Sequence, residues 1–177
     1  DDDFLVRQRA KEIFDELAQA FPDELSREIV DGRADRVDDV VRILAEVRSA
    51  AGTLSLFGGG MLVWLNEANF LNQTRVGASQ GSKDELDKAK DFLGKLGEGT
   101  QVIFSACPVH RNHAFVKWLQ KNAKYEDVSK NEKSDFAFRR IVEETSKECG
   151  VAYASGAVDM LAAKIGGNAR LAAEETR

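Results

Sequence analysis

The chain has 177 residues, a formal net charge of −5 at pH 7 and a hydrophobic fraction of 43%. This length fits one domain, or one domain with a small appendage, and the acidic balance argues against a nucleic-acid coat protein, which needs a basic surface. No apolar run approaches the roughly 18 residues of a membrane helix, and two cysteines, Cys107 and Cys149, suit a reducing cytoplasm better than a disulfide framework.

Helices and short strands alternate over the first 128 residues. The first helix carries apolar residues at three-four spacing from Val6 to Phe21 and ends at Pro22. Asp35 can cap a second helix, whose apolar stripe from Val37 to Leu54 leads on to Phe57. Ser82 starts a capping box for a third helix, and a fourth is expected over 112–122. Strands are predicted at 27–30, 61–65, 100–105 and, as a last short strand, 125–128.

This alternation predicts a parallel sheet with helices on both faces. After Val128 the pattern contains helices only, one ending at Gly150 and the next running from Ser155 to Ile165. The sequence therefore predicts an α/β domain over residues 1–129 and a small helical domain over 130–177.

An apolar pair sits where the second helix is expected to end. Leu56 and Phe57 directly precede Gly58-Gly59-Gly60, and glycine stops a helix because it adopts the left-handed conformation without a Cβ clash. Two large apolar side chains at a helix tip have little core around them. We therefore expect them to face a partner.

The strand at 61–65 ends in Asn66-Glu67. In P-loop ATPases the corresponding strand ends in two acids that position magnesium and water. Asn66 carries no charge and is a poor magnesium ligand. No phosphate-binding loop or lysine precedes the first helix, which opens instead on Asp1-Asp2-Asp3. A simpler interpretation of the strand at 61–65 is a core strand that meets a polar loop. A simpler interpretation of Asp1-Asp2-Asp3 is a solvated helix start.

Two metal sets are conceivable from the residues alone. Cys107, His110 and His113 are spaced three apart, but no fourth ligand is close in sequence. Asp1, Asp2 and Asp3 could also hold a cation. A metal-dependent hydrolase is therefore kept as an alternative function, beside a nucleotide-binding ATPase.

Taken together, these segments resemble the delta subunit of the bacterial DNA polymerase III clamp loader. No single motif is diagnostic, and the order and spacing of the segments carry the resemblance. The matching segments are Asp2-Asp3-Phe4-Leu5-Val6, Leu54-Ser55-Leu56-Phe57, Asn66-Glu67, Glu98-Gly99-Thr100, Phe115-Val116-Lys117-Trp118-Leu119 and Gly166-Gly167-Asn168-Ala169-Arg170-Leu171.

The resemblance implies an AAA+-type fold, in which a RecA-like parallel-sheet domain is followed by a three-helix lid. It also implies a degenerate nucleotide site at Asp3, Asn66, Glu67 and Arg170, with no catalysis and no cofactor. Leu54, Ser55, Leu56 and Phe57 take the role of the element that docks the sliding clamp.

The resemblance further implies that the subunit opens the clamp for loading onto primed DNA, within a cytoplasmic, nucleoid-associated replisome. The holoenzyme is a DNA-directed DNA polymerase, which is a nucleotidyltransferase. The subunit is expected to interact with DNA indirectly, as part of this complex. The gamma/tau and delta prime subunits are expected as partners through a C-terminal collar domain that these residues do not include.

Overall fold

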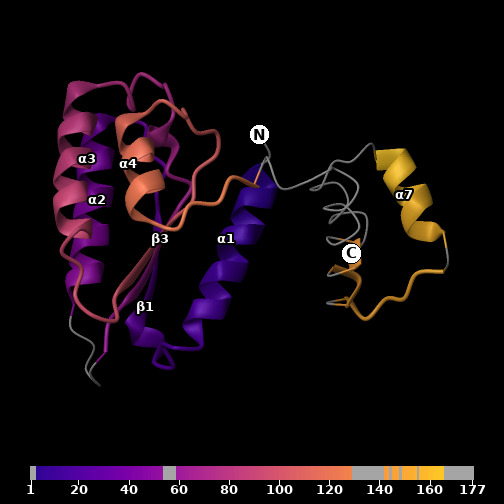
Figure 1. Cartoon of the computed structure of the whole chain (residues 1–177). Coiled ribbons are helices and arrows are strands. Elements are labelled where there is room, and N and C mark those ends of the chain that lie inside the picture. The colour runs from indigo at the N-terminus through magenta and orange to yellow at the C-terminus, as the bar shows by residue number, and fades with distance from the viewer. Residues whose placement is uncertain are drawn as a thin grey trace. The chain divides into compact units, whose positions relative to one another are not determined.

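A computed structural model describes residues 3–53, 59–128, 142–143, 145–147, 149–154 and 156–165. The chain divides into two compact units, Asp1–Glu126 and Asp127–Arg177, which are described separately. The first unit holds the sheet and most of the described helices (Figure 1). Its elements are α1 (Asp3–Ala18), η1 (Glu24–Ser26), β1 (Arg27–Asp31), α2 (Val37–Gly52), β2 (Leu62–Asn66), η2 (Asn69–Leu71), α3 (Gln80–Leu93), β3 (Gln101–Phe104) and α4 (Ala114–Asn122).

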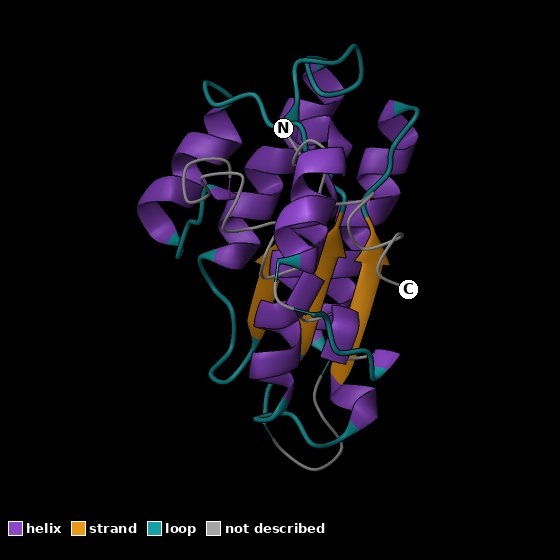
Figure 2. Cartoon of the chain, turned by 90° about the vertical axis from the view of Figure 1, so that its right-hand side faces the viewer, coloured by secondary structure: helices purple, strands orange, loops and turns teal. Residues whose placement is uncertain are grey.

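The sheet has three parallel strands in the order β1-β2-β3, seen side by side in Figure 2. Arg27 of β1 pairs with Leu62 of β2, which in turn pairs with Gln101 of β3. The central strand β2 is buried from Leu62 to Leu65, as expected for a strand covered on both faces. Helix α1 lies on one face, and α2, α3 and α4 lie on the other (Figure 1). The predicted α/β class and the parallel sheet are therefore confirmed.

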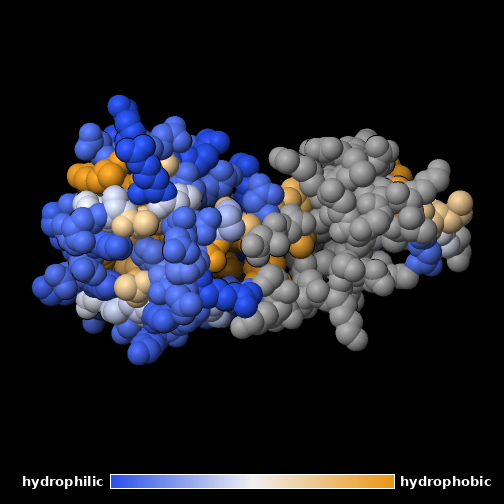
Figure 3. Space-filling model, turned by 90° about the horizontal axis from the view of Figure 1, so that it is seen from above, coloured by the Kyte–Doolittle hydropathy of each residue, from blue (hydrophilic) through white to orange (hydrophobic). Residues whose placement is uncertain are grey.

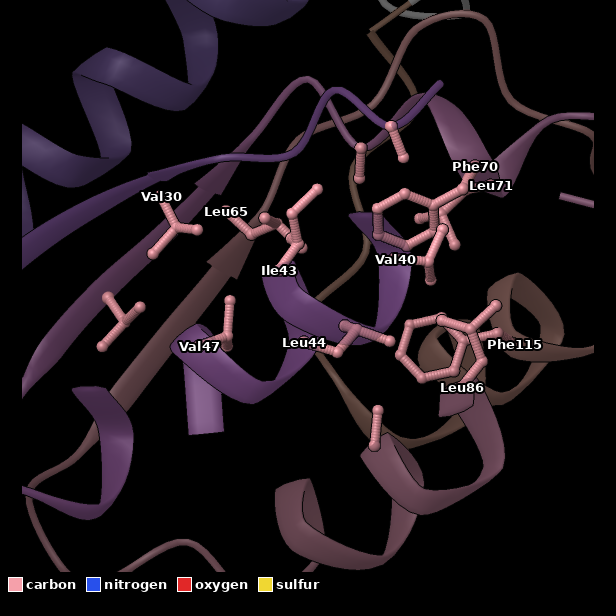
Figure 4. Close-up of a cluster of buried hydrophobic side chains, with 14 of the residues drawn as sticks. Val30, Val40, Ile43, Leu44, Val47, Leu65, Phe70, Leu71, Leu86 and Phe115 are labelled. Carbon is pink, nitrogen blue, oxygen red and sulfur yellow. The ribbon is translucent and has the colours of Figure 1, made fainter. Parts of the chain in front are cut away.

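The main core lies between the sheet and α2. Val40, Ile43, Leu44 and Val47 recur at three-four spacing and are almost fully buried against β1 and β2 (Figure 4). Phe115 of α4 joins the same cluster. A smaller cluster under α1 holds Ala18, Phe21 and Leu62, with Phe14, Leu17 and Ile103 packed against it.

Several predicted boundaries are wrong, each for a local reason. Helix α2 ends at Gly52, with Thr53 as its cap, so it does not reach Gly58. Its N-cap residue is Arg36 and not Asp35, and the carboxylate of Asp39 in the first turn accepts the backbone N–H groups of Asp35 and Arg36. Helix α3 starts one turn earlier than expected, because Ser79 accepts the N–H of Ser82.

Residues 124–127 form neither helix nor strand, so the predicted strand over 125–128 is wrong. Instead, a side chain ties this stretch to α1. Arg9 donates to both carboxylate oxygens of Glu126, at 2.9 and 3.3 Å. These hydrogen bonds hold the pKa of Glu126 below its usual value. A charge-assisted pair, and not a ladder of backbone bonds, therefore fixes the chain at the end of the first unit.

In the second unit, the structure describes helix α7 (Ala157–Ile165) and a helix end at Gly150. Gly150 has φ +68, and the N–H of Val151 reaches the carbonyl of Ser146 at 2.8 Å. This is the glycine-capped helix end that the sequence predicts. Among the described residues, no helix combines the length and apolar character needed to cross a bilayer.

Candidate functional site

The four predicted partner-binding residues, Leu54, Ser55, Leu56 and Phe57, lie outside the described residues. The residues on either side are described. Thr53 closes α2, donating its hydroxyl to the carbonyl of Ser49 at 2.9 Å and its N–H to that of Ala50 at 3.2 Å. Helix α2 is firmly held, since six of its residues, from Val40 to Ala51, are buried. The predicted partner-binding segment therefore follows, in sequence, a helix that is held in the core.

A small hollow lies at the carboxyl ends of β2 and β3, beside the start of α1. It is lined by Asp3, Val6, Arg7, Asn66, Glu67, Ser105, Ala106 and Cys107. Three of the four residues assigned to the degenerate nucleotide site, Asp3, Asn66 and Glu67, thus share one hollow. Arg170, the fourth, lies outside the described residues. Figure 3 looks at this end of the first unit, whose surface is mainly hydrophilic.

Asn66 forms hydrogen bonds within the protein through both its side chain and its backbone. Its side-chain oxygen accepts the Ser105 hydroxyl at 3.2 Å, and Ser105 in turn accepts the indole N–H of Trp64 at 2.9 Å. The Asn66 carbonyl accepts the N–H of Gly32 at 2.6 Å. A Cβ at Gly32 would lie 2.6 Å from that carbonyl oxygen, so only glycine allows this approach. The side chain of Asn66 therefore ties β2 to β3.

Glu67 follows Asn66 in the left-handed backbone region, with φ 56. Its carboxylate lies 3.4 Å from Arg7 of α1 and 3.7 Å from Arg33, which follows β1. Arg33 also pairs with Asp31 at 2.6 Å. Hydrogen bonds from Arg33 hold the pKa of the Asp31 carboxyl below its usual value. Glu67 and Asp31 are thus each paired with arginine side chains.

The space left between these side chains is small. The hollow holds about 10 Å³, which is roughly the space of one water molecule. Pockets for nucleotide-sized ligands measure roughly 300–1,000 Å³. Ser105, Arg7 and Arg33 were not singled out from sequence for this site. They come from other elements, and only the strand order brings them beside Asn66 and Glu67.

His113 serves as a helix cap. Its Nδ1 accepts the N–H of Phe115 at 3.2 Å at the start of α4. Within the described ranges, no three His, Cys, Asp or Glu side chains are placed to hold a metal ion, and Cys107, His110 and His113 form no such group. Asp1 and Asp2 of the other conceivable set lie outside those ranges.

The cap makes stability depend on pH. Burial lowers the pKa of His113, and it outweighs the opposing effect of the Gly77 backbone, while the charges of His110, Lys83 and Lys90 act in the same direction as burial. Because the folded-state pKa lies below the unfolded value of about 6.5, the unfolded chain binds the proton more readily. The contribution of neutral His113 is therefore present above about pH 6.5 and lost as the pH falls through the folded-state pKa.

We expect His113→Asn to reduce this acid sensitivity, because asparagine caps a helix without titrating near neutral pH. Urea unfolding of both proteins between pH 7.5 and 5 measures the effect. The two stability curves should diverge below about pH 6.5. Parallel curves over that range would show that the pKa of His113 is not lowered in the folded protein.

The comparisons with known proteins give one family. The family model described as DNA polymerase III, delta subunit, matches residues 1–129. No curated protein and no solved structure gives a significant match.

Proposed function

We propose that this chain, which belongs to the DNA polymerase III delta-subunit family, binds the sliding clamp and opens it for loading onto primed DNA. The family is a non-catalytic component of the clamp loader in DNA replication. Its match covers the whole of α2 and the Leu54–Phe57 segment that follows. This family match is the observation that carries the proposal. It covers α2, a helix whose buried face packs on the sheet.

In the proposed mechanism, α2 is a rigid support for the Leu54–Phe57 segment that follows it. Leu56 and Phe57 enter an apolar pocket on the clamp, and Leu54 and Ser55 lead into the contact. Desolvating two such side chains contributes roughly 1.5–3 kcal/mol each. Binding to a distorted form of one clamp interface would let the ring open. ATP would act in neighbouring loader subunits, which expose or hide this segment.

The architecture supports an AAA+-type assignment. A RecA-like domain is proposed for residues 1–129 and a helical lid for 130–177. In the first unit, parallel strands alternate with helices that cover both faces of the sheet. The division between the compact units falls after Glu126, close to the proposed boundary.

The hollow lined by Asp3, Asn66 and Glu67 is proposed to be a nucleotide site that no longer binds nucleotide, with Arg170 as its former lid arginine. Two observations support this proposal: the polar side chains around the hollow already have partners in the protein, and the volume that remains is small. Arg7 and Arg33 already neutralise Glu67, Asn66 is bonded to Ser105, and the remaining space is about 10 Å³. The site has no cofactor in this proposal.

Magnesium-ATP should therefore leave the melting temperature of the chain unchanged. A ligand that binds only the folded state at 100 times its dissociation constant stabilises it by about 2.7 kcal/mol, which a thermal shift assay detects. A MgATP titration to millimolar concentration checks this, with an intact ATPase subunit of the loader as the positive control. A saturable rise in melting temperature would support the rival function, a nucleotide-binding AAA+ ATPase.

Clamp binding itself is tested by calorimetric titration of the sliding clamp of the same organism into the full chain. The proposal expects a saturable interaction that depends on Leu56 and Phe57. The other loader subunits are further proposed partners. We propose that the chain interacts with DNA indirectly, as part of the assembled complex, in the cytoplasm.

A further inference from the structure

Strand β1 lies at an edge of the sheet, since the strand order is β1-β2-β3. Within the described parts of the chain, no strand pairs with its outer side. The N–H of Gly32, just after β1, donates to the carbonyl of Asn66 on β2 at 2.6 Å. The backbone groups of successive residues in a strand point alternately to its two sides. Counting back from Gly32, the backbone groups of Arg27, Ile29 and Asp31 therefore point outward, away from β2.

The side chain of Ile29 on this edge strand is open as well. Ile29 pairs in the sheet with Trp64, whose ring centroid lies 5.6 Å from that of Phe14 on α1, so Ile29 belongs to the face on which α1 lies. Helix α1 packs mainly over β2 and β3. Ile29 is consequently 55% exposed, and Leu25, just before the strand, is 73% exposed. An edge strand that carries an exposed apolar side chain is a surface to which another strand can add.

The charges along β1 are complementary to those of a second copy of the same strand. The strand reads Arg27-Glu28-Ile29-Val30-Asp31, so opposite charges lie two residues before and two residues after Ile29. If two copies pair antiparallel about a two-fold axis at Ile29, Arg27 of each copy lies opposite Asp31 of the other. The two Ile29 side chains then meet on the axis. Both kinds of cross-strand pair stabilise a sheet, whereas an axis at Glu28 would oppose two like charges.

The same axis also matches the outward backbone groups of the two strands. Ile29 of each copy would donate its N–H to the Ile29 carbonyl of the other copy. The N–H of Asp31 would donate to the carbonyl of Arg27 in the other copy. The N–H of Arg27 takes no part, because it is already bonded to the carbonyl of Glu24. This pairing joins the two sheets into one and uses the same surface on both copies, as a two-fold interface does.

We propose that this protein self-associates through β1, with two copies paired antiparallel about Ile29. Stable interfaces bury roughly 1,200–2,000 Å², and a strand of 5 residues offers less than this. The Asp31 carboxylate is also shared with Arg33, its partner within the chain at 2.6 Å. The dimer is therefore weak and forms at roughly 0.1 mM and above. Its surface includes no residue from Leu54 to Phe57, so it does not depend on the proposed clamp contact.

Sedimentation equilibrium of the full chain between roughly 0.01 and 1 mM measures this association. We expect a reversible monomer–dimer equilibrium that Ile29→Lys weakens roughly tenfold, because this variant places two ammonium groups opposite each other on the axis. Met160→Lys is the matched control, since Met160 is an apolar residue on α7 that is 69% exposed. The control should dimerise as the unsubstituted chain does. A chain that stays monomeric, or a dimer that Ile29→Lys leaves unchanged, would overturn the inference.

Two charge variants test the register and keep Ile29 in place. Arg27→Glu and Asp31→Arg should each weaken the dimer roughly tenfold, because each places like charges opposite one another. An equimolar mixture of the two variants should associate again, to within roughly threefold of the unsubstituted chain, because every charge in the mixed dimer faces its opposite. The two positions are about 13 Å apart along one strand, so they cannot pair within a single chain. A mixture that does not associate would overturn the inference.

A strand of the sliding clamp is the other candidate for this edge. Titration of the clamp into the Ile29→Lys chain separates the two, and we expect the clamp affinity of the unsubstituted chain. If Ile29→Lys weakened clamp binding and the unsubstituted chain stayed monomeric, β1 would belong to the clamp contact and self-association would be overturned. Leu56→Ala with Phe57→Ala should leave the dimer intact, so failure of the proposed function and failure of self-association give different results.

Discussion

Replacing Leu56 and Phe57 together by alanine is expected to weaken clamp binding by roughly 100-fold or more. Each side chain contributes about 1.5–3 kcal/mol when it leaves water for an apolar pocket, and 1.4 kcal/mol is a factor of ten in affinity. An aromatic anchor at the centre of an interface commonly dominates such a contact. Calorimetry or surface-based kinetics with the cognate clamp measures the change, which should lie mainly in the dissociation rate.

Val41→Ala is the matched control for this double variant. Val41 lies on α2 as well and is exposed, at 39% of its surface, but it belongs to the first turns of the helix, toward the opposite end from Gly52. Its loss should leave clamp affinity unchanged. If the double variant bound as tightly as Val41→Ala, Leu56 and Phe57 would not be the contact, and the assignment of all four residues from Leu54 to Phe57 would be withdrawn.

Phe115→Ala is expected to lower the free energy of unfolding by about 3–5 kcal/mol, the usual cost of removing a large buried aromatic side chain. Phe115 is 1% exposed. Its ring centroid lies 5.7 Å from that of Phe104 on β3 and 5.8 Å from that of Trp118. The substitution removes the largest of the α4 side chains that are buried in the core shown in Figure 4, where Val116 of the same helix also lies.

Urea unfolding followed by circular dichroism measures this loss. Leu25→Ala serves as the comparison, because Leu25 is 73% exposed and its removal should change stability by no more than about 0.5 kcal/mol. A loss below about 1 kcal/mol for Phe115→Ala would mean that α4 does not depend on this contact, contrary to the packing described.

The periodicity of the apolar residues was enough to predict the layers of the fold. The stripe on α2 from Val40 to Val47 and the continuous apolar run of β2 both lie in the core, as expected from their spacing. These patterns reflect the burial of apolar side chains, which is the main driving force of folding. The parallel arrangement followed from the alternation of strands and helices.

Boundaries were harder to predict, because several local groups compete for the same role. Both Ser79 and Ser82 can cap a helix, and Ser79 does so while Ser82 is buried and bonded to it. The apolar residues after Ala51 extended the helical pattern as far as Phe57, but the helix ends at Gly52. Tyr125 fits a strand pattern, yet the Arg9–Glu126 pair holds this stretch outside the sheet.

Only some residues around the hollow were singled out from the sequence. The family resemblance assigned Asp3, Asn66 and Glu67 to a degenerate nucleotide site, and these three line the hollow. Their partners could not be singled out, since Arg33 follows one strand, Ser105 follows another and Arg7 belongs to a helix. Nothing in local sequence links these residues. The strand order β1-β2-β3 and the position of α1 bring them together.

The chain is proposed to bind the sliding clamp without needing nucleotide of its own. Calorimetric titration of the cognate clamp into the full chain, with and without MgATP, tests it most directly. We predict saturable binding with the same affinity in both conditions. Absence of binding, or binding that appears only with MgATP, would contradict the account.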